Sequence, residues 1–375
     1  MKFVLAPDSF KESLTAKEVV DAMEVGIKKI FKDAECVKVP MADGGEGTVQ
    51  SLVDATDGKI YEVVVTGPLG NKVNAKYGIL GDGQTAVIEM AEASGIHYVK
   101  KEDRNPLITT TFGTGELIKS ALDKGVKKII IGIGGSATND GGAGMLQALG
   151  AKLLDKDNKE IPFGGGGLSE LVKINLDDFD KRIKEVEIEV ACDVSNTLTG
   201  KEGASAVFGP QKGATEEIIK ILDENLHHYA DIVNKTIGKD MENQKGSGAA
   251  GGLGFALLAF CDGKLNRGID IVIKYADLSE KMKGASYVIT GEGSIDSQTK
   301  FGKTPFGVSQ VAKQYDIPVI GIAGNVGEGI DELYDLGFDS ILSIMPGVMT
   351  LDKALSNAKE NIENTLEKAM QTYYI

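Results

Sequence analysis

The sequence predicts a two-domain α/β protein in which one domain is inserted into the other. Two apolar, strand-like runs lie before residue 60, at 2–6 and 36–40, and three more lie after residue 285. Helical patterns alternate with these runs, as expected for buried parallel strands joined by crossover helices. The segment between the two ends instead starts with short runs joined by glycine turns, which favours antiparallel hairpins.

The two ends of the chain form the first predicted domain. Its expected strands are 2–6, 36–40, 287–290, 318–322 and 340–344, and its expected helices are 16–31, 48–55, 306–314 and 351–369. Five parallel strands with alternating helices match a doubly wound, flavodoxin-like sheet. The prediction is therefore a discontinuous flavodoxin-like domain at 1–60 plus 281–375.

The middle of the chain forms the second predicted domain, a mixed α/β domain at 61–280. Its expected strands are 61–66, 72–80, 85–90, 128–133 and 186–192, and its expected helices are 115–124, 143–149, 216–236 and 251–260. Two domains also fit the length of 375 residues, because a single core stops growing at roughly 250–300 residues.

The composition excludes several classes of partner. The formal net charge is −14, which argues against a surface for nucleic acid or for anionic membranes. No apolar stretch is long enough to span a bilayer. The three cysteines have no CxxC spacing and look like reduced thiols. We therefore expect a cytoplasmic protein that binds small molecules and neither nucleic acid nor membranes.

A glycine-rich loop at 132–144 follows the expected strand 128–133 and precedes the expected helix 143–149. A strand, a glycine loop and a helix in this order present free backbone N–H groups to an anion, which indicates an enzyme that handles phosphate. The residues of this loop that we expect to bind a cofactor are Gly134, Gly135, Ser136, Thr138, Asn139 and Gly141. Residues 132–137 also fit the dinucleotide fingerprint GxGxxA, with Asp155 in the place of a ribose-binding acid. An NAD(P)-dependent dehydrogenase of small hydroxy acids is thus an alternative.

Charged loops follow other predicted strands. Asp8, Ser9 and Lys11 come after the first strand, where capping of the next helix by Ser13 or Thr15 would not require the two charged residues. Asp43 lies in a three-glycine loop after the second strand; it suits hydroxyl or Mg²⁺ binding, or equally an acidic turn.

A third charged loop follows the expected strand 287–290. The triplet from Gly302 to Thr304 fails the Walker A pattern, because Ser297 stands where that motif needs glycine. Lys303 nevertheless precedes Pro305, a good first helical residue, and can meet an anion at that helix start, with Glu292 and Asp296 near a metal.

Two residues of the middle segment complete the candidates. Asp193 is a candidate general base at a strand exit, and an Asx turn is an equally good explanation of it. Lys212 is a candidate phosphate ligand. A Gly-x-Ser-x-Gly elbow and a His/Cys metal set are both missing from the sequence, which disfavours serine hydrolases and zinc enzymes.

These loops together closely resemble the bacterial type 1 glycerate kinase family. The matching motifs run along the whole chain, at 6–11, 42–48, 111–115, 134–144, 191–194, 208–214, 290–293 and 298–299. Glu12 and Thr197 depart from the family pattern, standing where glycine and proline are expected.

The resemblance implies a flavodoxin-like domain with an inserted second domain. It also implies ATP-dependent, Mg²⁺-assisted phosphorylation of D-glycerate to 2-phosphoglycerate, with phosphorylation at the 3-hydroxyl as an alternative. The expected partners are the small-molecule substrates D-glycerate and ATP, and a homo-oligomer remains open.

For such a reaction we assign hypothetical roles to the candidates. Asp193 orients the glycerate hydroxyl and accepts its proton, while Lys11 with Ser9 holds the glycerate carboxylate or the γ-phosphate. The glycine loop and Lys303 bind ATP phosphates. The expected Mg²⁺ ligands are Asp43, Glu292 and Asp296, and the further substrate-binding residues are Asp8, Asp43 and Lys212.

Overall fold

The computed structural model describes residues 1–373 and divides the chain into two compact units. Unit 1 consists of Met1–Gly58 together with the chain from Arg267 onward, and unit 2 is Lys59–Asn266. The expected second boundary, after residue 280, places one short helix and the start of another in the inserted domain, although both belong to unit 1. These are α9 (Gly268–Tyr275) and α10 (Leu278–Met282). Among the described residues, no helix is both long and apolar enough to cross a membrane.

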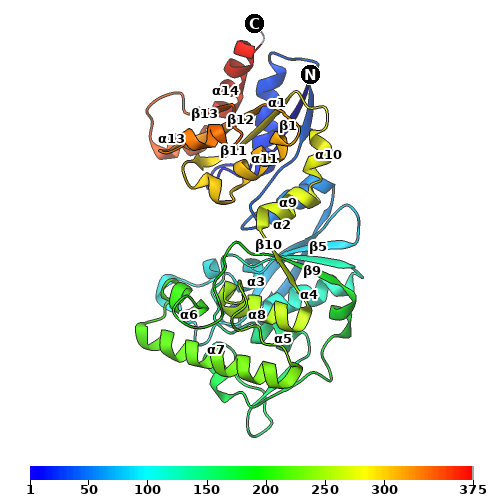
Figure 1. Ribbon diagram of the computed structural model, residues 1–375, viewed down its shortest axis with the longest axis vertical. Helices are drawn as coiled ribbons and strands as arrows, with labels where there is room; N and C mark the ends of the chain where they lie inside the picture. Colours follow the sequence, from blue (N-terminus) through cyan, green and yellow to red (C-terminus); the bar gives the residue numbers. More distant parts are fainter. Residues whose placement is uncertain (374–375) are drawn as a thin grey trace. The chain divides into compact units, whose positions relative to one another are not determined.

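Unit 1 contains a five-stranded, fully parallel sheet (Figure 1). The strands are β1 (Lys2–Leu5), β2 (Glu35–Lys38), β11 (Tyr287–Ile295), β12 (Val319–Val326) and β13 (Ser340–Ser343). Their order across the sheet is β13-β12-β11-β1-β2. Counted along unit 1 this is 2-1-3-4-5, the flavodoxin-like order, so the predicted fold class is confirmed.

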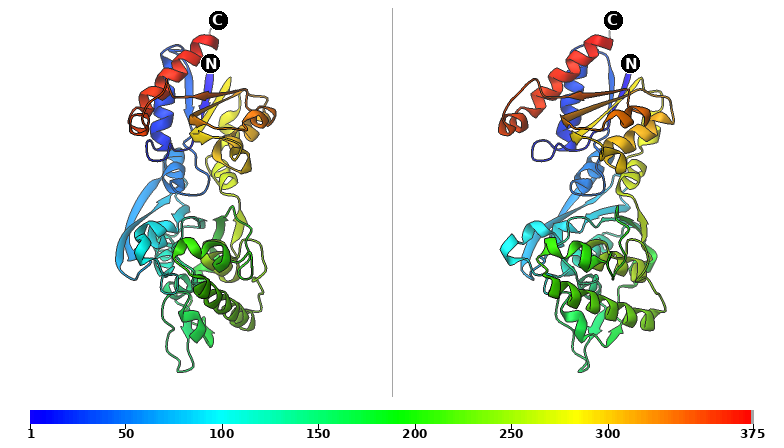
Figure 2. Two further views of the ribbon diagram at one scale, coloured as in Figure 1. Left: turned by 90° about the vertical axis from the view of Figure 1, so that its left-hand side faces the viewer. Right: turned by 60° about the vertical axis from the view of Figure 1, so that its left-hand side comes forward.

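Helices alternate with these strands as the sequence predicts. They are α1 (Ala16–Lys28), α2 (Thr48–Thr56), α11 (Thr304–Lys313), α12 (Asp331–Asp335), α13 (Leu351–Ser356) and α14 (Ala358–Tyr373). The single helix expected at 351–369 is thus two helices that meet at Asn357. Helices α1 and α14 pack side by side (Figure 2), and buried side chains such as Ile27 and Leu366 join the core beneath them.

Strand β11 is longer than the sequence predicts. The glycine-rich stretch after Thr290 was expected to be a loop, yet β11 continues to Ile295. The extension is paired in parallel with β12, with Glu292 opposite Ala323 and Ser294 opposite Asn325. Backbone pairing with a neighbouring strand therefore outweighs the low strand propensity of glycine here, and it fixes Glu292 on a strand.

Unit 2 contains a mixed six-stranded sheet in the order β10-β9-β6-β5-β4-β3. The strands are β3 (Lys59–Thr66), β4 (Lys72–Ile79), β5 (Thr85–Glu89), β6 (Lys128–Gly132), β9 (Glu187–Ala191) and β10 (Lys264–Asn266). The first three pair antiparallel, as the turns predict, and β5, β6, β9 and β10 are parallel. A separate hairpin is formed by β7 (Lys152–Leu154) and β8 (Lys173–Asn175).

The helices of unit 2 pack around this sheet. They are α3 (Ala91–Ser94), α4 (Phe112–Asp123), α5 (Ala143–Ala148), α6 (Ala204–Phe208), α7 (Glu216–Ile237) and α8 (Ala249–Cys261). Helix α8 begins with a kink, in which Ala250, Gly251 and Gly252 have left-handed φ angles of 53°, 67° and 91°. The core of unit 2 is a separate cluster, with members such as Ile131, Leu253 and Tyr229.

Candidate active site

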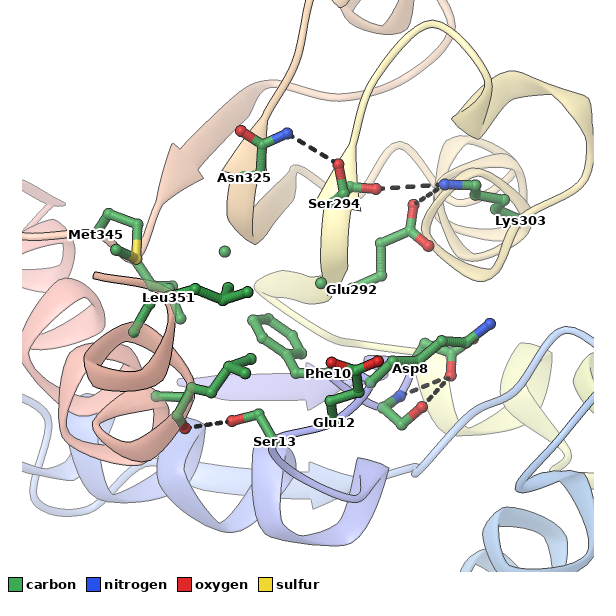
Figure 3. A pocket seen from close by; sticks show the side chains of 18 of the residues that line it. Asp8, Phe10, Glu12, Ser13, Glu292, Ser294, Lys303, Asn325, Met345 and Leu351 are labelled. Atoms are coloured by element: carbon green, nitrogen blue, oxygen red, sulfur yellow. Dashed lines mark hydrogen bonds and ion pairs between the residues drawn. The ribbon is translucent and has the colours of Figure 1, made fainter. Parts of the chain in front are cut away.

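A pocket of about 690 Å³ opens in unit 1 at the carboxyl ends of β1 and β11. Along unit 1 the chain leaves these neighbouring strands toward opposite edges of the sheet, and such a switch point is where open α/β sheets bind ligands. Six predicted site residues line the pocket: Asp8, Ser9, Lys11, Asp43, Glu292 and Lys303. Figure 3 labels Asp8, Glu292 and Lys303. Asp296 is not among the lining residues.

The carboxyl group of Asp8 is held where β1 ends. It accepts hydrogen bonds from the Ser9 backbone N–H at 2.6 Å and from the Thr304 hydroxyl at 2.5 Å. Burial raises the pKa of Asp8 to about 6, against these hydrogen bonds, which favour the charged form. The carboxylate of Asp43 contributes further to the rise by repulsion.

Capping of the first helix does not use these groups. The hydroxyl of Thr15 accepts from Glu18 N–H, and the Glu18 carboxylate accepts from Thr15 N–H, so Thr15 and Glu18 form a capping box. Lys11 is exposed, and its ammonium group has no ion pair among residues 1–373. It is therefore available to an anionic ligand.

Glu12, which stands where the family pattern has glycine, adopts a backbone conformation that glycine favours. Its φ angle is 63°, in the left-handed region where glycine is favoured. The tight turn between Phe10 and Leu14 thus keeps its shape with a glutamate in place of glycine. The strain of such a conformation is of order 1 kcal/mol.

Glu292 and Lys303 both line the pocket and form an ion pair with each other. The Lys303 ammonium lies 3.3 Å from Glu292 Oε1, and the Thr299 hydroxyl donates to the same oxygen at 3.1 Å. Burial raises the pKa of Glu292 to about 7 even though Lys303 favours the ionised form. Lys303 is the N-cap residue of α11, and Pro305 follows in the first turn, as predicted.

The acidic residues of the pocket fit a magnesium ion that keeps most of its ligands as water and phosphate. Within residues 1–373, no group of three or more His, Cys, Asp or Glu side chains is arranged to hold a metal ion. Asp43 accepts from Gly45 N–H, and Asp296 accepts from Gln298 N–H in its own turn. Mg²⁺ requires only one or two carboxylates, because it keeps several waters and binds substrate phosphates. The carboxylates of Asp8, Asp43 and Glu292 meet that requirement.

A second set of predicted residues lies in unit 2, at the carboxyl ends of two neighbouring strands. Strands β6 and β9 are parallel neighbours, with Gly132 opposite Ala191. The loop at Gly134 and Gly135 therefore lies beside the strand exit that carries Asp193. Both glycines and Asp193 are exposed.

Neither packing within the protein nor the backbone conformation requires glycine at position 134. A Cβ atom built there meets nothing within 4 Å, and its φ angle is outside the left-handed region. Among residues 1–373, neither the Gly134 N–H nor the Gly135 N–H donates a hydrogen bond. The loop thus offers two amides and open space to a ligand that approaches the backbone closely.

The second half of the glycine loop is buried. Thr138 and Asn139 are fully buried, and the Asn139 amide donates to the Ser205 hydroxyl at 2.9 Å. The Gly141 N–H donates to the carbonyl of Gly251 in α8. The cofactor contact predicted for these three residues stays a prediction; in this structure Asn139 and Gly141 bind the loop to the interior.

Lys212 is also buried. Its side chain is 2% exposed, and its ammonium group donates to the Thr138 carbonyl at 2.6 Å. Burial lowers the pKa of Lys212 to about 7, although the nearby Asp140 carboxyl favours the charged form. The phosphate contact predicted for Lys212 stays a prediction; in this structure its ammonium group holds the glycine loop.

Sequence reasoning missed Asp140 as a structural centre of this loop. Its carboxylate accepts four hydrogen bonds, from the N–H and hydroxyl of Thr111 and from the N–H groups of Gly142 and Gly144. It also missed Thr304, which holds Asp8, although that threonine lies beside the Lys303 signal. Ser294 and Asn325 line the pocket and carry no sequence signal.

The dinucleotide fingerprint lacks its structural context. After β6 the chain does not enter a helix until Ala143, whereas the fingerprint requires a tight turn directly into a helix. The Asp155 carboxylate accepts from the N–H groups of Asp157 and Lys159 in its own turn. The dehydrogenase alternative therefore has no structural support.

A flavodoxin-like unit with a charged pocket at its switch point, joined to a second α/β unit, defines an enzyme that acts on small anionic molecules. The chain belongs to the glycerate kinase family: the model of the Glycerate kinase family matches residues 3–374. The protein is therefore an enzyme of the kinase class.

Several relatives are similar over nearly their full length. The chain is 57% identical to a glycerate kinase of Bacillus subtilis, over 97% of this chain and 96% of that protein. It is 54% identical to a glycerate 2-kinase of Escherichia coli, over 96% of this chain and 95% of the relative. A crystal structure of a putative glycerate kinase 2 from Salmonella typhimurium matches with a TM-score of 0.92 at 53% identity, covering 100% and 98% of the two chains.

Proposed function

We propose that this protein transfers the terminal phosphoryl group of ATP to the 2-hydroxyl of D-glycerate, giving 2-phosphoglycerate. The observation that carries the proposal is the gathering of Asp8, Lys11, Asp43, Glu292 and Lys303 in one pocket of a chain that belongs to this family. The name of the Escherichia coli relative, a glycerate 2-kinase at 54% identity, supports the 2-position over the 3-position.

The residues of unit 1 supply charge for phosphoryl transfer. Lys11 and Lys303 would neutralise phosphate or carboxylate oxygens, and little covalent help is needed beyond positioning and charge stabilisation. Asp8, Asp43 and Glu292 would hold Mg²⁺, with Asp296 close along the chain. When bound, this ion would offset the charge of the phosphates.

The residues of unit 2 supply a base and an anion site. Asp193 would orient the glycerate hydroxyl and accept its proton. The free amides of Gly134 and Gly135, with Ser136, would bind an anionic oxygen of a substrate. Thr138, Asn139, Gly141 and Lys212 would act by holding this loop in place.

We also propose a cytoplasmic location, because the cysteines Cys36, Cys192 and Cys261 are all free thiols.

An assay of product identity tests the proposed reaction. The purified chain is incubated with ATP, Mg²⁺ and D-glycerate, and the release of ADP is followed together with the phosphorus NMR spectrum of the product. We expect ADP release only when D-glycerate is present, and a product that carries phosphate on its secondary carbon. A product phosphorylated on the primary carbon would overturn the 2-position, and release independent of D-glycerate would overturn the acceptor.

Asp193→Asn tests the role of the base. We expect kcat to fall by about 10²–10⁴-fold while the KM values for both substrates change little, because a positioned base acts mainly in the transition state. Asp178→Asn is the matched control: this aspartate lies in unit 2, its side chain is 64% exposed, and it pairs with Lys152. Unchanged turnover in Asp193→Asn would remove Asp193 from the mechanism.

A further inference from the structure

The pocket in unit 1 has two chemically different sides. One side carries the charged groups of Asp8, Glu292 and Lys303. The other is apolar and comes from the segment after β13 and from α13, through Met345, Met349, Leu351 and Leu355, with Ile344 and Phe10 beneath. Figure 3 shows Met345 and Leu351 on the side away from Lys303.

The apolar side is not explained by D-glycerate. That molecule has three carbons, each bearing oxygen, and its recognition requires charges and hydrogen bonds. The proposed acceptor would fill only a part of about 690 Å³ and would leave the methionines and leucines without a partner. Leu351 is 69% exposed in this structure, so burial against a ligand would remove a large apolar side chain from water.

Gly293 provides an independent sign of a ligand in this pocket. It lies in the interior of β11, between Glu292 and Ser294, and it lines the pocket. A Cβ atom built there would find its nearest neighbour at 3.9 Å, the backbone nitrogen of Lys11, and its φ angle is outside the left-handed region. Neither packing nor backbone conformation requires a glycine. Glycine within a strand without such a need marks a place where a ligand approaches closely.

We propose that this pocket binds the nucleotide, with the base of ATP against the apolar side and its phosphates toward Lys11 and Lys303. A nucleoside triphosphate has a flat base with apolar faces at one end and a chain of negative charges at the other, which is the division found in the pocket. Methionine side chains adapt readily to a flat ring. Unit 1 is then the nucleotide-binding unit. This inference rests on the proposed function, in which ATP is the phosphoryl donor.

Unit 2 has a different task under this assignment. The free amides of Gly134 and Gly135 are then available to the carboxylate of the acceptor or to the transferred phosphoryl group. The glycine loop, which the sequence favours as the cradle for ATP phosphates, would not contact the base.

Leu351→Asp tests the assignment of the base. Leu351 is the first residue of α13, where an aspartate suits the helix, so the variant is expected to fold. Val348→Asp is the matched control: Val348 is fully exposed, belongs to the same segment and does not line the pocket. Binding of two probes, ADP and inorganic triphosphate, is measured by titration calorimetry on the full chain with Mg²⁺.

We expect Leu351→Asp to raise the Kd for ADP by about tenfold or more, because a carboxylate would have to lose water against the base. The Kd for inorganic triphosphate, which lacks a base, is expected to stay within about twofold. Val348→Asp is expected to change neither value. Gly293→Ala, whose methyl group would enter the pocket, is expected to weaken ADP binding as well.

An unchanged Kd for ADP in Leu351→Asp would overturn the inference, as would an equal loss of triphosphate binding or a wild-type chain that does not bind ADP. Failure of the nucleotide assignment can be distinguished from failure of the proposed glycerate kinase activity. If D-glycerate is not phosphorylated but Leu351→Asp selectively weakens ADP, the acceptor is wrong and the nucleotide site stands. If D-glycerate is phosphorylated and ADP binding is insensitive to Leu351→Asp, the base lies elsewhere.

Discussion

The ammonium group of Lys212 lies inside unit 2, where it donates to the Thr138 carbonyl and lies near the buried carboxyl of Asp140. Burial lowers the pKa of Lys212 from the ordinary 10.5 to about 7. Below about pH 7 the group is charged in both the folded and the unfolded chain, so the full cost of burying the charge is present. As the pH rises from about 7 toward 10.5, the folded chain has lost the proton that the unfolded chain still binds. The free energy of unfolding therefore rises with pH in this window.

We predict that this pH dependence disappears in Lys212→Met. The free energy of unfolding of the wild type, relative to that of the variant, is expected to increase by about 2–3 kcal/mol between pH 6.5 and 9.5. Urea unfolding at the two pH values, followed by circular dichroism, measures the difference. A difference that is constant or falls with pH would show that Lys212 keeps its charge in the folded chain.

Single residues also show how far sequence reasoning reaches at this scale. Asp8, Lys11 and Lys303 were recognisable because each follows a strand or begins a helix, and parallel strands bring such ends together. The burial of Lys212 and Asn139 could not be predicted, because both lie in loops of polar composition, where residues are normally exposed. Only tertiary packing on Asp140 and α8 turns this polar loop inward.

The loop after β6 is an element with two differently built halves. Its first half includes the exposed Gly134 and Gly135, and Gly134 has open space around it, whereas Ser136 is buried. Its second half is pressed against the kinked start of α8, where a Cβ atom on Gly251 would lie 2.0 Å from the Thr138 carbonyl oxygen. Gly251 also has a left-handed φ angle, so two independent reasons require glycine at that position.

Alanine is predicted to lower activity without loss of stability at Gly134, and to lower stability at Gly251. Gly134→Ala should leave the melting temperature within about 2 °C of the wild type, because the methyl group meets no protein atom, and should lower kcat/KM by about tenfold or more. Gly251→Ala should lower the free energy of unfolding by about 2–4 kcal/mol through the clash and the strained φ angle. Thermal unfolding and the ADP-release assay on both variants check this. Full activity in a stable Gly134→Ala would exclude close approach of a substrate to this backbone.

Strand β11 marks the limit of prediction for elements. The apolar run at 287–290 was enough to predict a strand, and the parallel arrangement of the strands followed from the alternating helices. The continuation to Ile295 depends on pairing with β12. No local pattern in the Gly-Glu-Gly-Ser stretch predicts this pairing. For the same reason the apolar side of the pocket was not predicted: Phe10 and Leu351 are far apart in the sequence and line one pocket only in the folded unit.

At the scale of the whole molecule, the two units have separate cores. The buried cluster around Ile131 and Leu253 lies entirely within 59–266, and the cluster around Leu5, Ile289 and Leu366 lies entirely within unit 1. Unit 2 is continuous in sequence, whereas the sheet of unit 1 needs both ends of the chain, because β1 pairs with β11. The chain enters unit 2 at β3 and leaves it at β10, the two edge strands of its sheet. Removing the segments on either side therefore interrupts no strand pairing of that sheet.

We predict that the fragment 59–266 folds by itself and does not bind ADP. Its sheet and core are complete, so it should unfold cooperatively in urea. If the base of the nucleotide binds in unit 1, ADP at about 100 times its Kd for the full chain should stabilise the full chain by about 2.7 kcal/mol and leave the fragment unchanged. Thermal unfolding of both proteins with and without ADP and Mg²⁺ measures this. A fragment that folds and is stabilised by ADP to the same extent would place the nucleotide in unit 2, on the glycine loop that the sequence favours.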